Sequence, residues 1–279
     1  MSTVTAPERP APRAPLTAGV ATTGAANPLA VVRQSLALAW RGLIKIRRTP
    51  EALIDVTIQP TIFLGLFVTI FGSAVAGSRH DYLTSLLPGL LAQSIATAAV
   101  AIGVNLNTDL EKGVFDRFRS LPIARSAPLI GAVLADAVRY TIVTIMTLVP
   151  GYAMGYRIST SAFGLVAGAL LAIGFGLCIS WISVFVGMMV RTSGAVQGIM
   201  FMLVLPLSFG ADIFVPVDTL PGWMQAIVRI NPLTHLVRAM RGLWNGGAVA
   251  ADVWLTLGWM AAFVAVFMPL ALRAYRRRA

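Results

Sequence analysis

Residues 109–125 read Asp109-Leu-Glu-Lys-Gly-Val-Phe-Asp-Arg-Phe-Arg-Ser-Leu-Pro-Ile-Ala-Arg125, a charged island between two apolar runs of membrane length. Because about 20 apolar residues span the hydrocarbon core of a bilayer, the island must lie at a membrane face. A loop that only sets topology would explain its arginines. An amphipathic helix explains its interleaved acids and phenylalanines as well, with the charges facing a soluble partner and the aromatic rings facing the membrane or a groove on that partner.

The composition is that of an all-α polytopic membrane protein. The 279 residues are 57% hydrophobic and 12% charged, with a mean hydropathy of +0.79, whereas a soluble domain has about 25% charged residues. The net charge of +11 does not indicate nucleic-acid binding, because the basic residues lie at the ends of apolar runs. The single cysteine, Cys178, excludes an internal disulfide and a cysteine-rich metal site.

The order of segments predicts a disordered tail followed by one transmembrane domain, residues 29–279. Residues 1–28 are rich in proline, alanine and threonine and are predicted to be disordered. Residues 29–48 predict a basic amphipathic helix with Trp40 as its interfacial anchor, or a basic juxtamembrane stub. Six apolar runs then predict six transmembrane helices within residues 53–273: 53–76, 84–107, 129–153, 162–189, 193–211 and 252–273.

The charge distribution predicts the orientation. An even number of spans places both termini on one side, where sixteen lysines and arginines gather against five on the other. By the positive-inside rule the termini and the island are cytoplasmic. We therefore expect a multi-pass protein of a bacterial plasma membrane.

Residues 212–251, between the last two spans, are predicted to form a re-entrant external segment. Asn231-Pro232 favours a break between two short helices, since proline is tolerated in the first turn of a helix. Trp223 suits the membrane interface. The residues of this external motif are Pro221, Trp223, Asn231 and Pro232.

Charges within the spans are few and are therefore candidate functional groups. Asp136 and Arg139 lie three residues apart, close enough to pair on one helix. One interpretation is functional: the two residues line a translocation path or couple helix movements. The other is structural: they form an internal ion pair whose charges cancel.

Small and flexible apolar residues offer weaker signals. The pairs Gly164/Gly168 and Gly194/Gly198 permit close helix packing within the chain or across a dimer. One group of apolar residues in the fifth predicted span indicates either an adaptable surface for apolar cargo or part of the hydrophobic core: Met200, Phe201, Met202 and Phe209.

Several catalytic classes are excluded by missing motifs. Neither lysine, Lys45 or Lys112, lies in the Gly-Lys-Ser/Thr sequence of a phosphate-binding P-loop. His80 and His235 are far apart, without the spacing of a zinc protease, and no Gly-x-Ser-x-Gly elbow is present. We expect no catalytic residue, metal or cofactor in this chain.

The run Lys112-Gly-Val-Phe-Asp-Arg-Phe-Arg-Ser-Leu-Pro-Ile-Ala-Arg125 resembles the signature of ABC-2 type exporter permeases, close to the daunorubicin/doxorubicin-resistance subgroup. Ala135-Asp-Ala-Val-Arg139, Leu220-Pro-x-Trp223 and Asn231-Pro-Leu-Thr234 also match, so the resemblance covers about residues 30–275. The family often has Gly-Thr-x-Glu where this chain has Gly113-Val-Phe-Asp116, so a contact of that threonine hydroxyl does not carry over.

The resemblance implies a permease without its own ATPase site. Two permease chains, identical or sister, would dock two copies of a separate ATP-binding subunit, and ATP would bind to that partner. The cargo would be a hydrophobic or amphipathic drug, antibiotic or lipid that leaves the cytoplasm or the inner leaflet. The alternatives are an ion-coupled secondary transporter and an intramembrane enzyme. The residues implied to couple the permease to the ATPase are Glu111, Lys112, Gly113, Phe115, Asp116, Arg117, Phe118, Arg119, Leu121 and Pro122.

Overall fold

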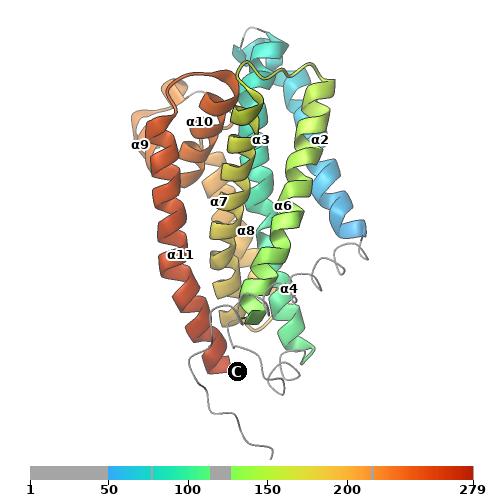
Figure 1. The fold of residues 1–279 in the computed structure, drawn as a ribbon, viewed down its shortest axis with the longest axis vertical. Coiled ribbons are helices and arrows are strands. Elements are labelled where there is room, and N and C mark those ends of the chain that lie inside the picture. Colours follow the sequence, from blue (N-terminus) through green and yellow to red (C-terminus); the bar gives the residue numbers. More distant parts are fainter. Residues whose placement is uncertain (1–49, 77, 114–126, 215–216, 279) are drawn as a thin grey trace, which may run out of the picture.

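The apolar runs form helices that lie side by side along the long axis of the molecule (Figure 1). The computed structural model describes residues 50–76, 78–113, 127–214 and 217–278. The elements in these ranges are α2 (Pro50–Ala76), α3 (Arg79–Ala98), α4 (Val100–Glu111), α6 (Ala127–Ala153), α7 (Ala162–Met189), α8 (Ser193–Phe209), the short 3₁₀ helix η1 (Val217–Thr219), α9 (Gly222–Ile230), α10 (Pro232–Asn245) and α11 (Ala250–Arg278).

Four helical stretches of the described ranges are long and apolar enough to cross a membrane: Arg79–Glu111, Leu129–Ala153, Ala162–Met189 and Ala250–Arg277. They coincide with four predicted spans and confirm an all-helical polytopic architecture. The other two predicted spans fall on the shorter apolar stretches Ile58–Gly72 and Ser193–Phe209. The predicted tail, 1–28, and interfacial helix, 29–48, lie outside the described residues.

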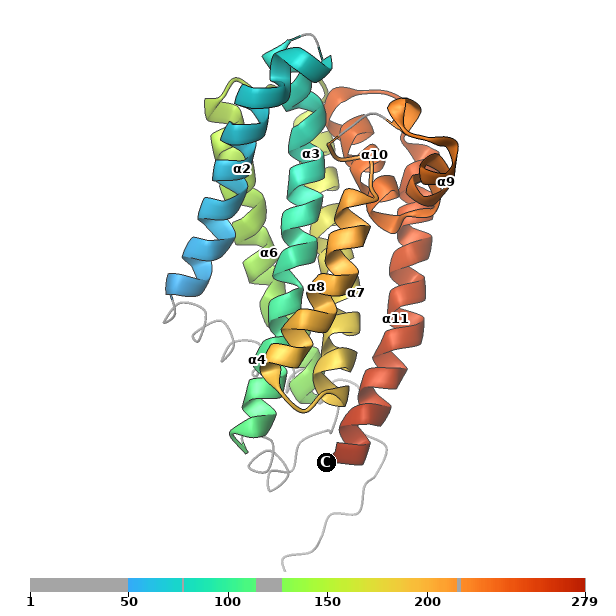
Figure 2. The same ribbon diagram turned by 180° about the vertical axis from the view of Figure 1, so that it is seen from behind.

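Helix α7 lies at the centre of the bundle, where it contacts α3, α4, α6, α8, α10 and α11 (Figure 2). Its Phe175 and Ile179 are almost completely buried. By contrast, Phe163, Met202 and Trp254 are 80%, 80% and 73% exposed. Apolar side chains on this scale on the outside of a bundle fit a hydrocarbon environment, since water would penalise them.

The bundle has two distinct ends. Helices α9 and α10 lie together at one end, which we call the hairpin end, and α4 and α11 finish at the other, the C-terminal end (Figures 1 and 2). The described structure has two short helices divided at Asn231, as the sequence predicted: α9 ends at Ile230 and α10 begins at Pro232.

Helices α4 and α7 approach each other backbone to backbone. The Gly103 N–H donates to Ser183 Oγ at 3.1 Å, and the same hydroxyl donates to the Val100 carbonyl at 3.0 Å. A Cβ on Gly187 would lie 2.6 Å from the Gly103 carbonyl oxygen. Glycine is required at this crossing because a side chain on either helix would separate the two backbones.

The two small-residue pairs of the sequence have different surroundings. Gly164 and Gly168 pack within the chain, against the Leu243 carbonyl and the Trp244 indole. Gly194 and Gly198 on α8 have no atom within 4 Å of where a Cβ would stand. The first pair therefore serves folding, and the second leaves a shallow face on α8.

Candidate functional site

A cavity of about 640 Å³ lies between α2, α3, α4 and α8. Phe63 of α2 and Phe201 of α8 are among its apolar lining residues. Its volume lies in the range of about 300–1,000 Å³ typical of small-molecule sites, which are mostly apolar with a few placed polar groups. The lining has this character. Its polar members are Gln59, Gln93, Ser94, Thr97, Asn105 and Gln197.

None of the described residues that line the cavity carries an ionisable side chain. All its polar groups are neutral amides and hydroxyls. Such a lining can hydrogen-bond a ligand in many orientations but offers no fixed charge to a polyanion. The arrangement fits an uncharged or weakly charged amphipathic molecule.

Gln93 has an unmet hydrogen-bonding group. Its Oε1 atom is buried and has no hydrogen-bond partner, whereas the Ser94 hydroxyl beside it donates to its own helix, at the Leu90 carbonyl, over 2.7 Å. A buried carbonyl oxygen without a donor destabilises the protein. A ligand donor in the cavity would relieve this cost, so Gln93 is the best-defined polar anchor of the site.

Asp136 and Arg139 form the ion pair that their spacing predicts, with Asp136 Oδ1 and Arg139 Nη1 3.4 Å apart on α6. Both are buried, at 3% and 8% exposed, and Asp136 Oδ2 has no hydrogen-bond partner. Neither residue lines the cavity. The geometry favours the internal ion pair over a lining role in this cavity.

Three of the predicted coupling residues, Glu111, Lys112 and Gly113, are described, and they lie at the end of α4. The Ser193 N–H, at the start of α8, donates to Glu111 Oε1 at 3.3 Å. Lys112 is the C-cap of α4, and Gly113 follows with φ 67°, a left-handed conformation that glycine adopts without strain. The other predicted coupling residues lie outside the described residues: Phe115, Asp116, Arg117, Phe118, Arg119, Leu121 and Pro122.

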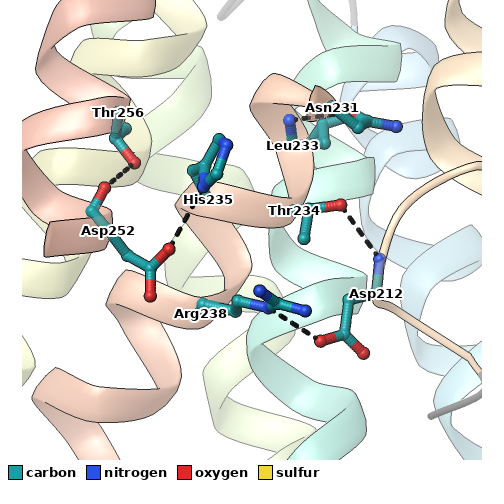
Figure 3. A network of polar contacts seen from close by, with 8 residues as sticks. All are labelled: Asp212, Asn231, Leu233, Thr234, His235, Arg238, Asp252 and Thr256. Atoms are coloured by element: carbon teal, nitrogen blue, oxygen red, sulfur yellow. Dashed lines mark hydrogen bonds and ion pairs between the residues drawn. The ribbon is translucent and has the colours of Figure 1, made fainter. Parts of the chain in front are cut away.

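Asn231 attaches α10 to the end of α8. Its Nδ2 donates to the carbonyls of Leu207 and Gly210, both at 2.7 Å. Its Oδ1 caps α10 by accepting the Leu233 N–H at 2.9 Å (Figure 3). Pro232 occupies the first turn of α10, as predicted. Pro221 is the N-cap of α9, and Trp223 is 67% exposed, as an interfacial anchor would be.

Asp212 is the ionic centre of the same region. Its carboxylate meets Arg238 Nε at 3.1 Å and Arg241 Nη1 at 3.2 Å, both on α10 (Figure 3 shows the Arg238 bond). Arg241 Nε also donates to the Ser85 carbonyl of α3 at 2.9 Å. Helix α10 is thereby attached to α3 and to the segment after α8. The Asp212 carboxylate therefore binds two arginines of α10.

A second set of polar contacts attaches α10 to α11 and to the α6–α7 connection. His235 Nδ1 lies 3.1 Å from Asp252 Oδ1 of α11 (Figure 3). The Tyr156 hydroxyl donates to Asn245 Oδ1 at 2.9 Å. Burial raises the pKa of Tyr156, and nearby Tyr152 raises that pKa further, so this hydroxyl stays protonated as a donor. In the described ranges no group of three His, Cys, Asp or Glu side chains could hold a metal ion.

Comparison with known proteins identifies the family. The model of the ABC-2 type transporter family matches residues 33–244. The chain belongs to the ABC-2 type transporter family. It is 40% identical over 247 residues, 88% of its length, to the daunorubicin resistance ABC transporter permease protein DrrB1 of Streptomyces coeruleorubidus, covering 87% of that protein.

Two Mycobacterium tuberculosis proteins are also similar. The chain is 26% identical to the probable doxorubicin resistance ABC transporter permease protein DrrC over 88% of its own length and 89% of that protein. It is 30% identical to the doxorubicin resistance ABC transporter permease protein DrrB over 72% and 70% of the two lengths. The ABC-2 chain is thus a multi-pass permease subunit of an ABC exporter, and such a permease implies a partner ATP-binding subunit.

Sequence reasoning missed most of the cavity of this permease. Gln93, Asn105 and Gln197 were not singled out, although an amide inside an apolar span is itself a signal, since hydrocarbon offers it no partner. The four predicted adaptable residues separate in the structure. Phe201 lines the cavity, Met200 is buried, and Met202 and Phe209 are exposed outside it.

Proposed function

We propose that this permease exports a hydrophobic or amphipathic compound, a drug or antibiotic, from the cytoplasm or inner leaflet, driven by ATP hydrolysis in its partner. The observation that carries the proposal is the uncharged cavity between α2, α3, α4 and α8. The names of the relatives, which refer to daunorubicin and doxorubicin resistance, support a drug as cargo. A lipid would also suit such a lining and is an outcome of the test below.

We further propose that two permease chains, identical or sister, face each other across the cavity and dock two copies of the ATP-binding subunit. Gln59, Asn105 and Gln197 line the cavity and are exposed on this single chain. Amides facing lipid are costly, and a second chain or enclosed water removes that cost. The open Gly194/Gly198 face of α8 supports close approach of that second chain.

The proposed topology has six spans, an interfacial helix at residues 29–48 and both termini in the cytoplasm of a bacterial plasma membrane. Charge counting supports it, with sixteen basic residues on the side of the termini against five. In this orientation the C-terminal end of the bundle, with Glu111, faces the ATP-binding subunits and the hairpin end faces outward.

The permease and its ATP-binding subunit, reconstituted together in vesicles, test this function. We expect daunorubicin accumulation in vesicles whose ATP-binding subunits face outward when ATP is present, and none with a non-hydrolysable analogue. Accumulation should persist after a protonophore collapses the proton gradient, because ATP supplies the energy. Transport that stops with the gradient while ATP remains would establish an ion-coupled carrier. ATP-driven movement of a fluorescent lipid but not of daunorubicin would reassign the cargo.

Replacing Gln93 with leucine should separate cargo binding from folding. We expect the apparent affinity for cargo to fall about 2–10-fold, the value of one hydrogen bond, while thermal stability stays unchanged or rises because a buried oxygen without a donor is removed. Cargo-concentration curves of transport and a melting curve of the purified permease measure the two effects.

Thr147→Val is the matched control, since the Thr147 hydroxyl is buried but already bonded to the Val143 carbonyl of its own helix at 2.8 Å, away from the cavity. Its affinity for cargo should be that of the wild type. An unchanged apparent affinity for cargo in the Gln93→Leu permease would show that Gln93 does not bind the cargo.

A further inference from the structure

The last turn of α4 is bonded to the last turn of α7 through one buried amide. Asn107 is completely buried, and its Nδ2 donates to the Gly187 carbonyl at 2.9 Å and to the Val190 carbonyl at 2.7 Å. The final carbonyls of a helix have no partner within that helix. Asn107 supplies the missing donor from α4, so the end of α7 depends on the position of α4.

The same turn of α4 also reaches the start of α8. Glu111 Oε1 accepts the Ser193 N–H at 3.3 Å, where a carboxylate interacts favourably with the N-terminal dipole of the helix. One turn before Asn107, the Gly103–Gly187 crossing prevents α4 and α7 from sliding past each other without a clash. Three helix ends therefore form one packed unit at the C-terminal end of the bundle.

This unit connects the first residues of the charged island, Asp109–Gly113, with the cavity. The island begins in the last turn of α4, at Asp109. Val104 and Asn105 of α4 line the cavity, as do Gln197 and Phe201 in the first half of α8. Asn105 and Asn107, two residues apart on a helix, point to opposite sides. Helix α4 thus presents one side to the cavity and the other to α7.

We propose that Asn107 is a positioning residue that makes displacement of the island reach the cavity wall, acting together with the Glu111–Ser193 contact. A push on α4 then moves the ends of α7 and α8 with it, and Gln197 and Phe201 follow. This inference rests on the proposed export function, and it assigns that function a specific route through described residues.

Two substitutions remove the two links separately. Asn107→Leu keeps a side chain of similar size but cannot donate to Gly187 and Val190. Ser193→Pro deletes the N–H that Glu111 accepts and is compatible with the fold, because Ser193 is the first residue of α8 and Thr192 before it is extended, at φ −123° and ψ 143°. Ser193→Ala keeps the N–H and is the matched control.

The measurement is cargo exported per ATP hydrolysed by the complete permease–ATPase complex in vesicles. We expect Asn107→Leu and Ser193→Pro each to lower this ratio by about fivefold or more, the lower range of coupling between two sites, while ATP hydrolysis continues. Ser193→Ala should match the wild type, and Asn107→Gln, which restores a donor, should recover part of the ratio.

The outcomes are separable. If the folded variants export as much cargo per ATP as the wild type, the positioning role is wrong and the export function stands. If Asn107→Leu does not fold, Ser193→Pro decides the matter, since proline in the first turn is well tolerated. A wild-type complex without ATP-dependent export would instead overturn the proposed function itself.

Discussion

Replacing Gly103 with alanine is expected to destabilise the permease more than the same replacement at the other described glycines, because a Cβ at Gly103 makes the closest contact. The new Cβ would lie 2.2 Å from the Ser183 carbonyl oxygen and 2.5 Å from its hydroxyl. The first of these atoms is backbone, so α4 and α7 must separate. Overpacking costs about 1–3 kcal/mol, and loss of the bond from the Gly103 N–H adds about 1 kcal/mol, a large share of a typical net stability of about 5–15 kcal/mol.

Thermal melting of the permease in detergent, with its level in the membrane, measures this effect. Gly258→Ala is the control, because no atom lies within 4 Å of a Cβ there, and alanine in place of glycine inside a helix is favourable by about 0.5–1 kcal/mol. The two variants should therefore shift the melting temperature in opposite directions. Equal melting temperatures would contradict the close crossing of α4 and α7.

Asn231→Ala is expected to release the hairpin end from α8. Loss of the Asn231 side-chain amide leaves the carbonyls of Leu207 and Gly210 without their donor and α10 without its cap. A lost cap costs about 1 kcal/mol, and each of the two lost hydrogen bonds to the partly buried carbonyls of Leu207 and Gly210 costs about 0.5–1.5 kcal/mol. We expect a total of about 2–4 kcal/mol, read from thermal melting.

Asn231→Asp divides this effect into its two parts. Aspartate keeps the acceptor for the Leu233 N–H but has no donor for Leu207 and Gly210. If attachment to α8 dominates, Asn231→Asp should melt close to Asn231→Ala; if the cap dominates, it should melt close to the wild type. If attachment to α8 dominates, limited proteolysis between α8 and α10 should be faster in both variants than in the wild type. If both variants show wild-type proteolysis and melting, the attachment does not contribute to stability.

The spans and the break in the hairpin could be predicted because they depend on local properties. Hydrophobic runs set where α3, α6, α7 and α11 lie, and Asn231-Pro232 both ends one helix and begins the next. The Asp136–Arg139 pair was also predictable, since its members are one helical turn apart. Each of these features is encoded within a few tens of residues.

The cavity and the role of Asp212 could not be derived in the same way, because they depend on which helices are neighbours. Asp212 lies 26 residues before Arg238 in the sequence, and Asn107 lies 80 residues before Gly187. Nothing local distinguishes Gln93, which lines the cavity, from an amide facing a neighbouring helix. Such contacts require the three-dimensional arrangement of α3, α4, α7, α8 and α10.

The uncharged lining of the cavity has an electrical consequence. Moving one elementary charge through the membrane potential involves about 2.3 kcal/mol per 100 mV, and the lining residues carry none. The Asp136–Arg139 ion pair on α6 has zero net charge. The conformational change by which the cargo-free permease returns to its starting state should therefore gain no energy from the membrane potential. A dependence of the export rate on membrane potential would then arise from the charge of the cargo. Current measured at a fixed ATP concentration would give the number of charges moved with each cargo molecule.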